Sequence, residues 1–166
     1  MSKVLVVYGT SSGCTSGVAE QIGRTLAESG ASVDVKSASE KPDASAYDAF
    51  VVGSGVRGGT WHAPVREWVK ANSADLKAKP LAMFTVGLMI TEEGKRDEVA
   101  GYNRALVEEN GLAPIDTGLF AGWNEPKAFS LPERLIMKMM KAPQGDFRDM
   151  AAVSEWTTTV APRLVA

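Results

Sequence analysis

Short apolar runs alternate with amphipathic segments along the sequence. Five of the runs predict strands buried in a parallel sheet: Val4–Tyr8, Val33–Val35, Ala49–Val52, Leu81–Val86 and Ile115–Phe120. Other segments repeat apolar residues every three or four positions, which predicts helices over or around Val18–Leu26, Pro64–Val69, Val99–Val107, Leu131–Lys141 and Met150–Val160. Gly30 and Gly111 stand where two of these helices should end.

Strands that alternate with helices predict right-handed βαβ units and one parallel sheet. The expected fold is an α/β three-layer sandwich with strand order 2-1-3-4-5, helices on both faces, and one domain over residues 1–166. In such sheets the ligand lies beyond the carboxyl ends of the strands. Three loops should meet there: Gly9–Gly17, Gly53–Trp61 and Gly87–Glu93.

The first of these loops has the composition of an anion site. It joins a strand to a helix N-terminus and consists of Thr10, Ser11, Ser12, Gly13, Cys14 and Thr15. Free N–H groups and the helix dipole attract anions there, and the hydroxyls add donors. The P-loop pattern GxxxxGK[ST] and the dinucleotide pattern GxGxxG are both absent. A loop without lysine suits a stably bound phosphate monoester, and the alternative is that its hydroxyls only cap the helix.

Composition narrows the function classes further. The 18 Lys and Arg against 20 Asp and Glu give a net charge of −2, without the strong positive field that a general nucleic-acid binder needs. The sequence has one cysteine and one histidine, which excludes a disulfide framework and a Cys/His zinc cluster. No leader pattern follows Met1, and the longest nearly apolar stretch, Leu81–Ile90, is short for a membrane span. We therefore expect a cytoplasmic protein.

The segment Val4–Gly23 resembles the flavodoxin signature, in which a strand leads through T/S-x-T/S-G-x-T into a helix. In that family the loop holds the phosphate of FMN. Two further segments, Gly55–His62 and Arg134–Met140, resemble the flavodoxin-like, menaquinone-dependent protoporphyrinogen dehydrogenases. Those enzymes use FMN and pass electrons to a quinone. The resemblance implies FMN as the cofactor, although the residues alone leave a deazaflavin open.

The match to the dehydrogenase pattern S-I-R-x-G-x-x-H is residue by residue at Arg57, Gly59 and His62. The sequence departs from the pattern at Gly58, which replaces an aromatic residue, and at Gly87, which replaces an Asn. The loop Leu88–Asp97 also lacks the family's basic character.

The resemblance places the flavin ring between the second and third loops. The expected contacts there are Ser54, Gly55, Val56, Arg57, Gly58, Gly59, Trp61, Val86, Gly87 and Leu88.

Four features of the second loop have two interpretations each. Trp61 stacks on the flavin or packs at a helix start. Arg57 lies at the N1/C2=O edge of the ring or is a solvated surface residue. His62 relays a proton or is a partly exposed histidine. The Gly58–Gly59 peptide turns toward flavin N5 or only makes a turn.

The first functional hypothesis is an FMN-dependent oxidoreductase that takes a hydride from an organic substrate, by resemblance a porphyrinogen, and delivers electrons to a quinone or a redox protein. The alternative is a flavodoxin-type electron carrier without its own substrate, which the near-neutral charge disfavours. A third hypothesis is a domain that has lost flavin or binds another phosphorylated ligand. The Met-rich, basic segment Leu131–Lys141 predicts either a core helix or peripheral contact with the inner face of the membrane.

Overall fold

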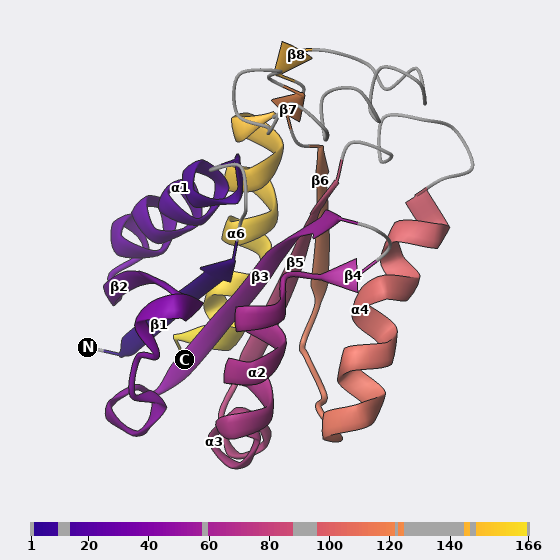
Figure 1. Ribbon diagram of the computed structural model, residues 1–166. Helices are drawn as coiled ribbons and strands as arrows, with labels where there is room; N and C mark the ends of the chain where they lie inside the picture. Colours follow the sequence, from indigo (N-terminus) through magenta and orange to yellow (C-terminus); the bar gives the residue numbers. More distant parts are fainter. Residues whose placement is uncertain are drawn as a thin grey trace.

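The computed structural model of the chain, shown in Figure 1, describes residues 2–9, 14–57, 60–87, 96–121, 123–124, 145–146 and 149–165. Its centre is a parallel sheet in the order β2-β1-β3-β5-β6, which confirms the predicted order. The strands are β1 (Lys3–Gly9), β2 (Ser32–Ser37), β3 (Ala49–Arg57), β5 (Leu81–Gly87) and β6 (Thr117–Ala121).

Helices cover both faces of this sheet (Figure 1). One face carries α1 (Cys14–Glu28) and α6 (Met150–Leu164). The other carries α2 (Ala63–Ala71), α3 (Ser73–Ala78) and α4 (Arg96–Asn110). Two short 3₁₀ helices, η1 (Ala38–Glu40) and η2 (Ala44–Ala46), connect β2 to β3. The predicted three-layer α/β sandwich is thus confirmed.

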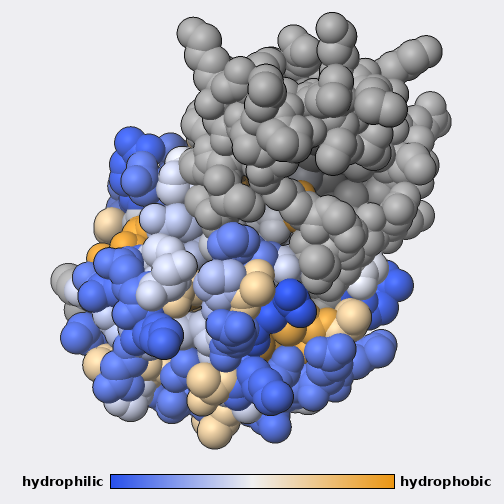
Figure 2. All heavy atoms as spheres, viewed as in Figure 1, coloured by the Kyte–Doolittle hydropathy of each residue, from blue (hydrophilic) through white to orange (hydrophobic). Residues whose placement is uncertain are grey.

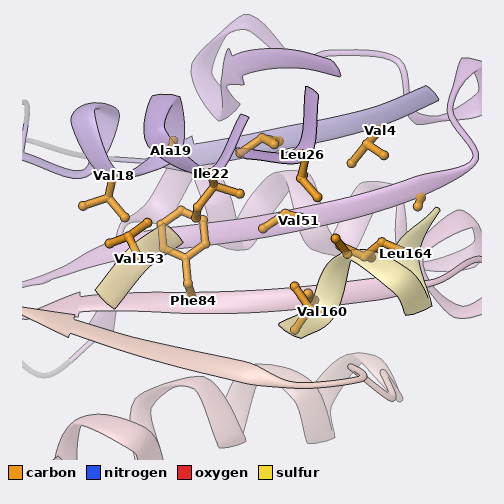
Figure 3. Close-up of a cluster of buried hydrophobic side chains, with 14 of the residues drawn as sticks. Val4, Val18, Ala19, Ile22, Leu26, Val51, Phe84, Val153, Val160 and Leu164 are labelled. Carbon is orange, nitrogen blue, oxygen red and sulfur yellow. The ribbon is translucent and has the colours of Figure 1, made fainter. Parts of the chain in front are cut away.

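The two layers form two apolar cores because successive side chains of a strand point to opposite faces. On β1, Val4 and Val6 join the core under α1 and α6, whereas Leu5 and Val7 join the core under α2 and α4. Figure 3 shows the first core, where side chains of α1 and α6 meet the sheet. A strand buried on both faces has to be apolar at every position, and the continuous run Val4–Val7 follows this rule.

Helix ends follow the expected glycine chemistry at two places. Gly30 has φ of 99° after α1, and Gly111 has φ of 63° after α4. This left-handed backbone is easily adopted by glycine and rarely by other residues, so the two glycines end their helices as predicted.

The segment Gly53–Trp61, predicted as a loop, is largely extended. β3 continues through Arg57, and the chain turns back as β4 (Thr60–Trp61), antiparallel to β3. The four glycines in this segment suggested a loop, but pairing with β5 holds it extended as far as Gly55. The prediction of a loop there was wrong for these residues.

A second short pairing joins two parts of the last third of the chain. β7 (Trp123–Asn124) runs antiparallel to β8 (Gly145–Asp146), where the sequence indicated irregular segments. The Met-rich segment Leu131–Lys141 lies outside the described residues. Among the residues that the structure describes, no helix has the length and apolar character required to cross a bilayer.

Candidate functional site

The carboxyl ends of three neighbouring strands lie in register. Gly9 of β1 pairs with Ser54 of β3, and Ser54 pairs with Thr85 of β5. The three predicted ligand loops start within two residues of these positions. The sheet therefore brings the loops to a common edge, which we call the crevice edge.

Thr15, in the first turn of α1, is the most unusual residue of this edge. Its side chain is 1% exposed, and its hydroxyl is the one buried side-chain polar atom of the described residues that has no hydrogen-bond partner. A buried hydroxyl without a partner costs about 1–3 kcal/mol. An oxygen of a bound ligand would remove this cost by pairing with the hydroxyl.

Glycine at position 55 makes room for this hydroxyl. A Cβ on Gly55 would lie 2.9 Å from Thr15 Oγ1, closer than a Cβ tolerates. Thr15 therefore lies against the end of β3, next to the predicted anion loop. Thr10, Ser11, Ser12 and Gly13 lie outside the described residues, as does the side chain of Cys14.

The first turn of α2 also packs closely against the strand ends. A Cβ on Gly9 would overlap Cγ2 of Val65 and lie 3.1 Å from Cδ2 of His62. His62 is half-buried and precedes α2 as its N-cap residue, without a capping hydrogen bond from its side chain. The structure thus places His62 at the end of β1, in the predicted crevice.

Trp61 lies inside the core rather than on the surface. Its side chain is 1% exposed and packs with the core under α2 and α4. Its indole Nε1–H donates to Thr85 Oγ1 over 3.1 Å. This is the helix-start packing that the sequence left open beside a stacking role, and it leaves no ring face at the surface.

The other predicted ring contacts are distributed around the same edge. Val86 is buried in the core under α1 and α6, Val56 is half-buried against the opposite core, and Gly87 ends β5. The backbone of Arg57 ends β3, while its side chain lies outside the described part of the chain. Gly58, Gly59 and Leu88 lie outside the described residues.

Two polar residues near the crevice edge were missed by the sequence analysis. Thr85 interrupts the apolar run Leu81–Val86, and this single hydroxyl inside a buried strand was the signal that could have revealed it. Tyr8 lies half-buried at the end of β1, where burial and then the charges of Glu40 and Glu20 raise the pKa of its phenol. Its hydroxyl is therefore protonated and neutral at physiological pH.

A separate groove of about 360 Å³ opens between α2 and α4. Figure 2 shows apolar residues at the surface there, surrounded by hydrophilic ones. Its lining includes Leu106, the cations Arg66 and Lys70, and the carboxylates Glu67 and Glu109. Charges of both signs do not define a preferred ligand charge. Within the described residues, no group of three or more His, Cys, Asp or Glu could hold a metal ion.

The strand order and the crevice edge define an open, five-stranded α/β protein whose ligand site is expected at the strand ends. Residues 5–151 match the sequence model of a family described as a flavodoxin domain. The chain belongs to that family.

Two proteins from different organisms are similar to this chain over most of its length. The chain is 26% identical over 160 residues to a protoporphyrinogen IX dehydrogenase [quinone] of Escherichia coli strain K12, covering 93% of this chain and 88% of that protein. It is 28% identical over 174 residues to a protein of the same name from Leishmania major, covering 96% of this chain and 74% of that protein.

A solved short-chain flavodoxin associated with a non-canonical PDU bacterial microcompartment has a similar fold. Its TM-score is 0.67 at 16% identity, with 99% of both chains covered. At this identity the likeness concerns the fold alone.

Proposed function

We propose that this protein is an FMN-dependent oxidoreductase that oxidises a porphyrinogen-like substrate and passes the electrons to a quinone. The observation that carries the proposal is the similarity, over more than nine-tenths of the chain, to two proteins named as quinone-linked protoporphyrinogen dehydrogenases. The motif residues Arg57, Gly59 and His62 agree with this assignment.

The unpartnered hydroxyl of Thr15 supports a phosphate group at the N-terminus of α1. A phosphate oxygen accepts hydrogen bonds from hydroxyls and from free N–H groups, and the helix dipole stabilises its negative charge. The residues that would hold the FMN phosphate are Thr10, Ser11, Ser12, Gly13, Cys14 and Thr15. The observed orphan hydroxyl and the predicted donor-rich loop therefore fit the cofactor that the resemblance implies.

The ring of the cofactor would lie along the end of β3 and the loop after β5, near Ser54–Gly59 and Val86–Leu88, with Trp61 in the core behind them. FMN, when bound, supplies the ability to accept a hydride from an organic substrate and to release electrons to a quinone. Arg57 would contribute a positive charge that favours added negative charge on the ring system.

His62 is suited to proton transfer in this reaction. A substrate that loses a hydride from carbon also loses a proton from nitrogen when a C=N bond forms. The half-buried imidazole lies at the end of β1, and a ring nitrogen of a neutral imidazole can accept a proton. We assign it this role of proton acceptor.

The first test is the visible absorption spectrum of the purified protein, followed by mass identification of what heat releases. FMN absorption bands and the FMN mass support the cofactor assignment. A deazaflavin mass, or no chromophore after incubation with FMN, contradicts it.

The second test is an anaerobic assay with protoporphyrinogen and a menaquinone analogue. The FMN-loaded wild type should form porphyrin faster than free FMN and faster than Gly13→Val, in which a Cβ blocks close approach to the phosphate. Equal rates in all three would overturn the dehydrogenase assignment. If FMN nevertheless binds, the electron-carrier alternative then takes its place.

A further inference from the structure

Gly9, Ser54 and Thr85 form a row of small or polar residues across three neighbouring strands. They pair in register, and they share the face of the sheet that α2 covers. Both hydroxyl residues, Ser54 and Thr85, are 0% exposed. On the same three strands the deeper positions of this face are apolar, so the row marks a change of chemistry at the crevice edge. These deeper positions are Leu5, Val7, Phe50, Val52, Leu81 and Met83.

The residues of this row contact and bind two consecutive residues, Trp61 and His62. Ser54 Oγ accepts a hydrogen bond of 2.9 Å from the backbone N–H of His62 and donates one of 2.7 Å to the carbonyl of Gly55. Thr85 Oγ1 accepts the indole N–H of Trp61 over 3.1 Å. Gly9, which has no Cβ, leaves the space that Cγ2 of Val65 occupies, with Cδ2 of His62 beside it.

A third bond holds the same pair from the helix side. Arg66 Nε donates to the carbonyl of Trp61 over 3.1 Å. The backbone N–H of His62, the backbone carbonyl of Trp61 and the indole of Trp61 are therefore bound by three different side chains. These contacts fix both the backbone and the side chain of the segment where β4 leads into α2.

Ser54 and Trp61 lie at the two ends of the β3–β4 hairpin. The chain pairs with β5 as far as Gly55, turns after Arg57 and returns along β3 at Trp61, and the next residue is bonded to Ser54 itself. One hydroxyl therefore closes the base of the hairpin that carries Arg57. A hairpin whose base is bonded in this way has less conformational entropy to lose on binding a ligand.

We propose that Ser54 and Thr85 are positioning residues that fix the β3–β4 hairpin, and with it Arg57 and His62, at the ligand crevice. The role of the hairpin toward the ring rests on the proposed function, whereas the bonding of its base does not. Thr15 acts at the opposite side of β3, toward α1, where the phosphate is expected. The two sets of hydroxyls should therefore serve different ends of the cofactor.

The first experiment measures hydrogen exchange in the ligand-free protein by ¹H–¹⁵N NMR. Ser54→Ala should raise the exchange rate of the His62 amide about tenfold or more, because the amide loses its acceptor. Thr85→Val should do the same for the indole N–H of Trp61. Thr157→Val is the matched control, since the Thr157 hydroxyl is also 0% exposed but bonds only within α6, to the carbonyl of Val153.

The second experiment compares the affinities of FMN and riboflavin, which lacks the phosphate. Ser54→Ala should weaken the binding of both ligands by a similar factor of about five, because the hairpin faces the ring that both share. Thr15→Val should weaken FMN binding and leave riboflavin binding nearly unchanged. If Ser54→Ala folds poorly, Thr85→Val gives the same comparison through the other anchor.

Unchanged exchange of the His62 amide in Ser54→Ala would overturn the proposal. Faster exchange with unchanged riboflavin affinity would also overturn it, because the hairpin would then be loosened without effect on the ring. If the wild type binds neither flavin, the proposed function fails instead. The exchange rates alone then decide whether Ser54 and Thr85 position the hairpin.

Discussion

Three buried hydroxyls lie at the carboxyl ends of the strands, and they differ in one respect. Ser54 and Thr85, on the face under α2, are both hydrogen-bonded within the protein. Thr15, on the face under α1, is equally buried and has no partner. The protein thus uses two hydroxyls to hold its own chain and leaves the third without a bond, at a cost in stability that binding of a ligand would offset.

This difference separates hydroxyls that hold the protein's own chain in place from a hydroxyl suited to bind a ligand, within one small region. A hydroxyl that is satisfied in the ligand-free protein gains little from a ligand, whereas an unsatisfied one gains a full hydrogen bond. In the ligand-free protein, removing a satisfied hydroxyl should therefore lower the free energy of unfolding, whereas removing an unsatisfied one should raise it. The following changes test this, from the largest expected effect to the smallest.

Trp61→Ala should lower the free energy of unfolding by about 3–5 kcal/mol, because it leaves a large cavity in the core and removes the partner of Thr85. Urea unfolding of the ligand-free protein, followed by circular dichroism, measures this. Trp156, which is half-buried in α6, supplies the control: Trp156→Ala should cost less. A loss below about 1 kcal/mol for Trp61→Ala would mean that the indole is not held in the core.

Thr85→Val should lower the free energy of unfolding by about 2 kcal/mol, because the buried indole N–H of Trp61 loses its acceptor. Valine preserves the shape of threonine, so the change isolates the hydrogen bond. The same urea titration measures the effect, and Thr157→Val should be close to neutral because its hydroxyl bonds a carbonyl of its own helix. Equal losses in both variants would argue against a special role for Thr85.

Thr15→Val should have the opposite sign and raise the free energy of unfolding of the ligand-free protein by about 1 kcal/mol. The replacement removes an unpartnered hydroxyl and keeps the side-chain volume. The same variant should bind FMN about tenfold more weakly, because a hydroxyl donor to a charged phosphate is lost. Thermal unfolding with and without FMN measures both effects, and a destabilised ligand-free variant would show that Thr15 already has a partner.

Tyr47 extends the comparison to the opposite, amino end of the sheet, where a buried hydroxyl is fully used by the fold. Its hydroxyl donates to Asp34 Oδ2 over 2.7 Å. Burial, followed by this bond and the charges of Asp34 and Asp43, raises the pKa of Tyr47 to about 12 from its ordinary 10.0.

Between pH 10 and 12 the unfolded chain loses this proton while the folded protein keeps it, so stability should fall as pH rises through this window. Tyr47→Phe should make the decrease shallower, and Asp34→Asn should give an intermediate slope. Urea unfolding at pH 9, 10 and 11 measures the slopes. Parallel curves for the wild type and Tyr47→Phe would show that Tyr47 titrates alike in both states.

Local sequence patterns were sufficient to predict the three layers of the fold. Each of the five parallel strands was visible as a short run with apolar residues. β1 and β5 gave nearly continuous apolar runs because they are buried on both faces, whereas the edge strand β2, with its exposed positions, was visible only as Val33 and Val35 around Asp34. The ends of α1 and α4 were visible at Gly30 and Gly111, because a left-handed residue favours glycine. Strand order followed from the regular alternation of strands and helices.

The hydroxyl-rich loop before α1 was also visible, since a strand followed by Ser, Thr and Gly at a helix start is a local signal. The burial of the Thr15 hydroxyl and its lack of a hydrogen-bond partner could not be read from the sequence, because they depend on packing against Gly55, forty residues away. The role of that residue in binding FMN stays a prediction.

The β3–β4 hairpin was invisible for the same physical reason. Four glycines between positions 53 and 60 favour a loop locally, and pairing with β1 and β5 on either side holds Gly53–Gly55 extended. The burial of Trp61 depends on a bond to Thr85, which is 24 residues further along the chain. Sequence periodicity reflects the environment of residues that are close in the chain. Hydrogen bonds across the sheet form only when distant segments pack together, and this packing determines the geometry of the crevice.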